Sequence, residues 1–344
     1  MERDFARASS EDEEKFSRKA MARNIPIGSQ NATVEVSQVR RVKGMKADLE
    51  VDCCLNRVRA GLRSDHTPKL TTDGTSGAYI LKNDDGNVAV FKPIDEEPFA
   101  PNNPRDLKGL FGSETCRAGV KSGESTLREV AAYLLDHGGF SGVPGTSLVE
   151  LQHPDLPYTP VTEDQVATQE HLMLLSELLS IKGKQASCDI SEQASESSYS
   201  TINSEASVEK TAKVGSLQTF VQADGPIENF STDLFSTDEI HKIAILDLRM
   251  FNLDRNSENI LVQRVGNAYR LVPIDHGLTL PDTLEVNSYD IAWLSTSQAE
   301  QPFSQTSREY IAALDADKDI LMLEENFKIR PICLRNMKAS TTML

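Results

Sequence analysis

Apolar positions along the chain follow two spacings, and together they predict a definite order of elements. Apolar side chains recur at helical spacing in three segments, residues 48–62, 123–135 and 237–250. Each such stripe predicts an amphipathic helix. Between the first two segments, the apolar runs 78–81 and 88–91 flank a turn rich in Asn, Asp and Gly. This arrangement predicts a β-hairpin with a loop longer than two residues.

Further strands are expected on both sides of a long polar stretch. Short apolar runs predict strands at residues 145–151, 216–221, 260–262 and 269–274. After residue 290 the pattern is mostly helical. Strands with one conspicuous helix thus come first and helices dominate later, an order that predicts an α+β fold of two lobes. A cleft between two such lobes commonly holds a small ligand.

Two segments lack this periodicity. Residues 1–45 are polar with mixed charge, and we expect them to be disordered. Residues 152–212 are rich in Ser, Glu, Gln and Thr in their second half, which predicts a low-complexity and mostly disordered insertion. Within it, Thr162 and Gln165 form a capping-box pattern before an apolar helix, which either docks a protein partner or packs on its own domain. The remaining segments are an N-terminal lobe (46–151), its last strand and hinge (213–222) and a C-terminal lobe (223–344).

Composition and charge argue against several classes of protein. The net charge of −16 argues against nucleic acid as a partner, because nucleic-acid binding needs a basic surface. The same charge weakens electrostatic attachment to anionic membranes. No run of about 20 apolar residues predicts a transmembrane segment. Residues 1–20 are charged and lack the apolar core of a secretory signal, so the protein is not expected to be secreted.

The five cysteines favour a reducing, cytoplasmic location. They form no paired Cys-x-x-Cys pattern, so neither a structural zinc site nor a disulfide framework is expected. The adjacent Cys53 and Cys54 have two interpretations. Either they carry a lipid that holds the chain at the membrane periphery or, as we expect, they are small residues buried in the first helix.

Phosphoryl transfer needs a loop over the phosphates, a cation, metal ligands and a proton acceptor. Thr75, Ser76 and Gly77 precede the hairpin, where small residues let backbone N–H groups approach phosphate oxygens. A turn that merely opens a hairpin would have the same composition.

Lys92 is the candidate cation. It ends the second hairpin strand, where a buried ammonium needs an anionic partner such as a phosphate. The alternative is an edge-strand lysine whose ammonium reaches solvent. Glu129, on the helix of residues 123–135, is expected to pair with this lysine, and Glu97 and Glu124 are rivals for that role.

The strongest local signal is the segment from Asp254 to Asn259, which precedes an apolar strand. An aspartate and an asparagine at this spacing on a catalytic loop can serve as proton acceptor and metal ligand. After the next strand, Asp275 enters a turn that Gly277 permits, and a carboxylate there can bind Mg²⁺. His276 is not expected to act as a base, because the Asp-x-Gly context already accounts for this position.

The order of these motifs resembles the phosphatidylinositol 3-/4-kinase superfamily, and within it the type II phosphatidylinositol 4-kinases of the plant-type gamma branch. The similarity spans about residues 65 to 344, apart from the insertion. The segments that carry it are residues 75–105, 128–136, 215–218, 246–250, 254–262, 272–281 and 301–304.

The resemblance implies a bilobal protein-kinase-like fold and an ATP-dependent phosphatidylinositol 4-kinase that uses Mg²⁺, with Mn²⁺ as an alternative. Asp254 and Lys92 would be catalytic, and Asn259 and Asp275 would bind the metal. The residues implied to bind ATP are Thr75, Ser76, Gly77, Lys92, Glu129, Gln218, Phe220 and Val221. The substrate implied is the inositol 4-hydroxyl of phosphatidylinositol in a membrane.

Departures from the family pattern leave the substrate open. Where the animal type II enzymes carry a palmitoylated cysteine cluster, this chain holds only Cys116. The family block at Trp293 is lengthened, and the chain ends at Leu344, which suggests truncation. No Lys or Arg occurs in residues 276–307, so bisphosphorylated lipids are not expected as substrates. The alternatives are a protein serine/threonine kinase of the same fold and a kinase-like scaffold that binds partners through residues 152–212.

Overall fold

The computed structural model describes residues 37–45, 47–176, 178–179 and 212–344. The predictions for residues 1–36 and 180–211 lie outside the described residues. The helices of the described part are α2 (Leu49–Arg63), α3 (Ser125–Leu135), α4 (Gln169–Leu175), α5 (Thr237–Met250), α6 (Gln305–Ala313), α7 (Ala316–Asn326) and α8 (Pro331–Met343). None of these helices is long and apolar enough to cross a bilayer.

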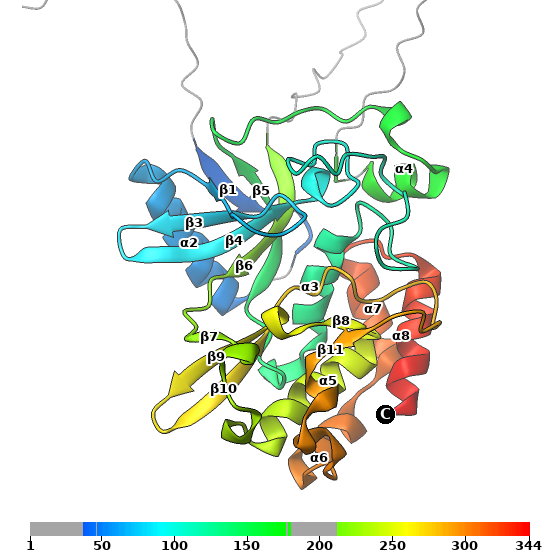
Figure 1. Ribbon diagram of the computed structural model, residues 1–344. Coiled ribbons are helices and arrows are strands. Elements are labelled where there is room, and N and C mark those ends of the chain that lie inside the picture. Colours follow the sequence, from blue (N-terminus) through cyan, green and yellow to red (C-terminus); the bar gives the residue numbers. More distant parts are fainter. Residues whose placement is uncertain (1–36, 46, 177, 180–211) are drawn as a thin grey trace, which may run out of the picture. The chain divides into compact units, whose positions relative to one another are not determined.

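The N-terminal part of the chain is built around an antiparallel sheet of six strands in the order β1-β5-β6-β4-β3-β2 (Figure 1). Within the described residues these strands are β1 (Gln38–Arg41), β2 (Lys69–Leu70), β3 (Tyr79–Asn83), β4 (Gly86–Pro93), β5 (Thr146–Gln152) and β6 (Lys213–Thr219). The predicted hairpin is formed by β3 and β4, whose register shifts between Leu81 and Lys82 near the turn.

Two helices cover the two faces of this sheet, because its strands alternate their apolar side chains. On β5, Leu148 lies in the core that contains α3, whereas Val149 lies in the core beneath α2. On β6, Val214 and Leu217 are divided in the same way. Successive side chains of a strand point to opposite faces, so the sheet is packed between α2 and α3 (Figure 1).

The C-terminal part combines helices with two small sheets, which contain the two strands predicted at residues 260–262 and 269–274 and three short strands that were not predicted. α5 begins after Ser236, whose side chain accepts from the Glu239 N–H, and ends at Phe251, whose φ of 51° is left-handed. These boundaries are the predicted ones. The smaller sheets have the orders β10-β9-β7 and β11-β8. Their strands are β7 (Gly225–Pro226), β8 (Asp254–Arg255), β9 (Ile260–Val265), β10 (Ala268–Pro273) and β11 (Asp290–Ile291).

The prediction of disorder for residues 1–45 and 152–212 is wrong for those parts of the two segments that the structure describes. Residues 38–41 form β1, which buries Val39 and pairs with β5. The insertion contains α4, and its Leu174 and Leu175 belong to the same hydrophobic core as α3. The helix after the capping box therefore packs on its own domain. On the other side of the insertion, β6 covers residues 213–219 rather than the predicted 216–221.

The N- and C-terminal parts share one hydrophobic core around α3. Leu127 of α3 packs there with Leu323 of α7 and Leu334 of α8. A buried arginine adds a polar link, since Arg249 of α5 donates to the Leu135 carbonyl at 2.5 Å and also pairs with Asp319 of α7. The orientation of α3 is thus set by both parts of the chain.

The cysteines of the described residues are free thiols. Cys54 is buried in α2, and Cys53 is exposed on the same helix. Both cysteines therefore lie in the first helix, as predicted, but the predicted burial is confirmed for Cys54 only. Cys188 lies outside the described residues.

Candidate active site

Lys92 is held at the end of β4 by two carboxylates. Its Nζ lies 2.5 Å from Glu129 Oε1 and 3.1 Å from Asp275 Oδ1. Burial alone would lower the pKa of the Lys92 ammonium, but the Asp275 and Glu129 carboxylates outweigh it and raise the pKa above its usual value. Lys92 is therefore a firmly charged cation, and it is not the solvent-directed edge lysine that was the alternative.

Glu129 joins this lysine to the turn that carries Asp275. Its Oε1 accepts from Lys92, and its Oε2 accepts from the His276 N–H at 3.0 Å. Burial would raise the pKa of this carboxyl, but the Lys92 charge and the His276 contact bring it well below its usual range. One glutamate of α3 thus holds β4 and the Asp275 turn together.

The two rival glutamates are engaged elsewhere. Glu97 accepts the N–H groups of Gly123, Ser125 and Thr126 at 2.8, 3.1 and 2.7 Å, and so caps the start of α3. Glu124 lies 2.8 Å from Arg128 Nη2 and 2.6 Å from Arg330 Nε. Both carboxylates fix α3, which leaves Glu129 as the partner of Lys92.

Asp254 and Asn259 lie on the loop that follows α5. The Asp254 N–H donates to Asn252 Oδ1 at 3.0 Å, and Asn259 Nδ2 donates to the Asp254 carbonyl at 3.1 Å. The second bond fixes the Asn259 amide, so that its oxygen is the group left to face a ligand. Burial, followed by the charges of Asp275 and Asp290, raises the pKa of Asp254.

A buried ionic cluster beneath this loop was not identified from the sequence. Arg255, fully buried, donates to Asp247 at 3.0–3.2 Å and to the Asn259 carbonyl at 2.9 Å, and it also contacts the Ile274 carbonyl. Trp293 Nε1 donates to the same Asp247 at 2.9 Å. The available signal was an aspartate inside the apolar helix 237–250, since a charge there needs a buried partner.

Asp275 adopts a left-handed backbone with φ 54°, and its side chain is 54% exposed. Together with Asn259 it offers two oxygen donors, a set that suits Mg²⁺ because Mg²⁺ usually takes one or two protein carboxylates plus phosphate oxygens and water. Among the described residues, no group of three or more His, Cys, Asp or Glu side chains forms a separate metal cluster.

The predicted phosphate loop is only partly available. The Gly77 N–H donates to the Glu96 carbonyl at 2.9 Å, so this donor is already used within the protein. A Cβ at position 77 would lie 2.0 Å from the Glu96 carboxylate, which explains the glycine. The Thr75 carbonyl accepts from Asn103 at 2.9 Å, and Ser76 is half-buried.

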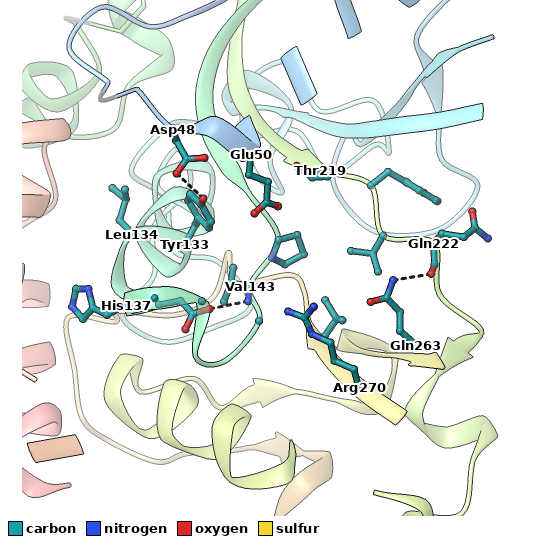
Figure 2. Close-up of a pocket in the computed structure, with 18 residues that line it drawn as sticks. Asp48, Glu50, Tyr133, Leu134, His137, Val143, Thr219, Gln222, Gln263 and Arg270 are labelled. Atoms are coloured by element: carbon teal, nitrogen blue, oxygen red, sulfur yellow. Dashed lines mark hydrogen bonds between the residues drawn. The ribbon is translucent and has the colours of Figure 1, made fainter. Parts of the chain in front are cut away.

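The hinge residues lie beside a cavity of about 950 Å³ (Figure 2). Phe220 and Val221 line it, together with Tyr133, Arg270 and other residues from the end of α3 and from β10. Its lining contains none of Lys92, Glu129, Asp254, Asn259 and Asp275. The cavity is therefore distinct from the cluster around Lys92.

Two predicted nucleotide contacts on the last strand are engaged within the sheet. Gln218 Nε2 donates to Thr146 Oγ1 at 3.0 Å, and the Phe220 N–H donates to the Val88 carbonyl at 2.9 Å. A bound adenine would therefore have to use other hinge groups, such as the backbone of Val221.

Comparison with protein-family models matches residues 74–344 to the phosphatidylinositol 3- and 4-kinase family. Among curated proteins, phosphatidylinositol 4-kinase gamma 4 of Oryza sativa subsp. japonica is 37% identical over 299 residues, which cover 83% of this chain and 43% of that protein.

Two proteins of Arabidopsis thaliana give similar matches. Phosphatidylinositol 4-kinase gamma 4 is 34% identical over 315 residues, with 87% of this chain and 47% of that protein covered. Phosphatidylinositol 4-kinase gamma 3 is 34% identical over 301 residues, with 83% and 45% covered. The chain thus spans less than half the length of these three relatives.

Proposed function

The chain belongs to the phosphatidylinositol 3- and 4-kinase family, and from that premise we propose that it transfers the γ-phosphate of ATP to the inositol 4-hydroxyl of phosphatidylinositol. The observation that carries the proposal is one cluster: Lys92 is joined to both Glu129 and Asp275, and the Asn259 carbonyl accepts from the Ile274 N–H at 3.0 Å, next to Asp275. The cluster supplies a cation, its helix partner and two oxygen ligands, and Asp254 supplies a base.

In the proposed reaction, the 4-hydroxyl oxygen forms a bond to the γ-phosphorus while the bond from that phosphorus to the ADP oxygen breaks. Asp254 accepts the hydroxyl proton, and its raised pKa makes it a stronger base than an ordinary aspartate. Lys92 neutralises phosphate oxygens while Glu129 holds its ammonium in place. A divalent metal bound by Asn259 and Asp275 would neutralise further phosphate charge.

The acceptor is proposed from the relatives, whose names describe phosphatidylinositol 4-kinases. The metal is proposed to be Mg²⁺, with Mn²⁺ as an alternative, because the two donors are hard oxygens. We place Thr75 and Ser76 over the phosphates, and Val221 at the adenine. The protein would act from the cytoplasm at the periphery of a membrane.

A direct test offers radiolabelled ATP and Mg²⁺ to the purified chain with phosphatidylinositol vesicles or with a general protein substrate, and uses Asp275→Ala as the blank. Label in the 4-position of the lipid is the expected result. Label in protein alone would instead identify a protein serine/threonine kinase. Binding of ATP with no label in either acceptor would favour the scaffold that binds partners through residues 152–212, of which residues 180–211 lie outside the described part of the chain.

A further inference from the structure

Arg117 is a buried cation whose hydrogen-bonding capacity is largely unused. Its exposed fraction is 9%, and its Nε has no hydrogen-bond partner among the described residues. Its Nη1 donates to the Ser288 carbonyl over a long 3.4 Å. The Nε–H group is thus a buried donor without a partner, and leaving such a donor unpaired is costly. An anionic ligand would remove that cost.

The other cations around the site are already paired. Lys92 is bound to Glu129 and Asp275, Arg128 and Arg330 share Glu124, and Arg255 is bound to Asp247. Residues 276–307, which follow the Asp275 turn, contain no Lys or Arg. Within the described part of the chain, Arg117 is therefore the cation near Asp254 that has no carboxylate partner.

The Arg117 side chain lies close to the strand pair that carries Asp254. Its Nη1 donates to the carbonyl of Ser288, two residues before Asp290, and Asp290 pairs with Asp254 between β11 and β8. Burial lowers the pKa of the Arg117 guanidinium and the charge of Asp254 opposes that effect. In turn, the charge of Arg117 lowers the pKa of Asp254. A cation from a separate loop thus lies near the strand pair that holds Asp254.

The loop that carries Arg117 is fixed against the segment after Asp275. The Gly119 carbonyl accepts from the Asp282 N–H at 2.9 Å and from Arg330 Nη2 at 3.1 Å. A Cβ on Gly119 would lie 2.7 Å from the Asp282 carboxylate, so the two segments are in close contact. The Arg117 carbonyl also accepts from the Val120 N–H at 3.2 Å. The guanidinium is therefore presented by a well-supported turn.

We propose that Arg117 binds the phosphodiester of phosphatidylinositol and orients the inositol ring, an inference that rests on the proposed function. The 1-phosphate and the 4-hydroxyl lie at opposite positions of that ring. When the hydroxyl is at Asp254, the phosphodiester points away from the ATP phosphates, and a second cation is needed to hold it. One arginine matches the single charge of a phosphodiester.

The test compares steady-state kinetics of the wild-type chain, Arg117→Gln and Arg117→Lys on mixed micelles of phosphatidylinositol. Arg117→Gln should raise the KM for phosphatidylinositol about ten- to a hundredfold and leave the KM for ATP within about twofold, because a charge-assisted hydrogen bond to the acceptor is lost. Arg117→Lys keeps the positive charge but loses the planar guanidinium that can donate two parallel hydrogen bonds. Its KM for phosphatidylinositol should therefore lie between those of the wild type and Arg117→Gln. Lys108→Gln, an exposed lysine nearby in sequence, is the matched control and should behave as wild type.

The outcomes separate this inference from the proposed function. An unchanged KM for phosphatidylinositol in Arg117→Gln, or an increase confined to the KM for ATP, would overturn the role of Arg117 while the kinase activity stands. A wild-type chain that does not phosphorylate the lipid would overturn the proposed function itself. A KM for ATP within about twofold of the wild-type value would show that the variant is folded. If Arg117→Gln is unstable, the KM of Arg117→Lys for phosphatidylinositol tests the same role.

Discussion

At the scale of single residues, the two carboxylates that bind Lys92 differ in how readily they can lose their contact with its ammonium group. Glu129 is 3% exposed, so it would be a buried, unpaired charge without the ammonium. The Asp275 side chain is 54% exposed and can exchange its contact with Lys92 for a metal ion. We therefore expect Lys92 to keep Glu129 and release Asp275 when nucleotide binds.

This difference predicts two kinds of loss. Lys92→Met and Asp275→Ala should each lower turnover by at least about a hundredfold, because each removes stabilisation of charge in the transition state. Lys92→Met should also lower the free energy of unfolding by about 1–3 kcal/mol, since Glu129 is left unpaired, whereas Asp275→Ala should not. Label transfer and urea denaturation measure the two effects. Lys82→Met, an exposed lysine of the same hairpin, is the control; near-normal turnover in Lys92→Met would refute its role.

The proposed role of Asp254 as the base predicts that a substitution at neighbouring Asp290 changes the pH dependence of activity. Asp290 pairs with Asp254 between β11 and β8, and its charge helps to raise the pKa of Asp254. A base must be ionised, so activity is lost as the pH falls through that pKa. Asp290→Asn lowers the pKa, and the acid limb of kcat/KM should move to lower pH. Glu285→Gln, an exposed acid in the same segment, should not shift it. A limb that stays in place in Asp290→Asn would argue against Asp254 as the base.

At the scale of elements, α3 is the part that brings the site together, and its position depends on its first turn. Glu97, from the loop after β4, is 3% exposed and accepts three N–H groups there. Because Glu129 lies on the same helix, any displacement of the first turn would also displace the partner of Lys92. The cap therefore connects the loop after β4 to the cluster around Lys92.

Removing this cap should be costly. Glu97→Ala leaves three buried or half-buried N–H groups without their acceptor, and we expect the free energy of unfolding to fall by about 2 kcal/mol or more. Turnover should fall as well, because Glu129 is no longer held. Chemical denaturation and label transfer test this, with the exposed Glu300→Ala as the control. A stability equal to that of the control would show that the first turn does not depend on Glu97.

An element can be predicted from the sequence when the residues that stabilise it are close to it in the chain, and it cannot when they are distant. The limits of α5 follow from a nearby cap and an unbroken apolar stripe, so they could be predicted. β1 has one buried side chain, Val39, and its existence depends on β5 far along the chain. The ion pair of Glu124 and Arg330 joins residues 206 positions apart, and no local sequence pattern predicts such a contact. The site motifs were recognisable because their chemistry restricts residue type, while the supporting charges were not.

At the scale of the whole molecule, the net charge of −16 would affect how the chain approaches its proposed lipid substrate. Phosphatidylinositol lies in a bilayer whose anionic lipids repel an acidic protein, and this repulsion acts over about 8–10 Å at physiological salt. A basic peripheral protein gains affinity from the same lipids. Residues 276–307, next to the catalytic aspartates, have no cation to offset the repulsion.

Activity on vesicles should therefore fall as anionic lipid is added. At a fixed fraction of phosphatidylinositol, replacing phosphatidylcholine by phosphatidylserine should lower the initial rate at low ionic strength. The decrease should become smaller as the salt concentration is raised to about 0.15 M and above, because screening shortens the range of the repulsion. Neutral detergent micelles that carry the same phosphatidylinositol provide the control for loss of catalytic competence. A rate that rises with phosphatidylserine would mean that a local basic surface, and not the net charge, governs the approach of the chain to the membrane.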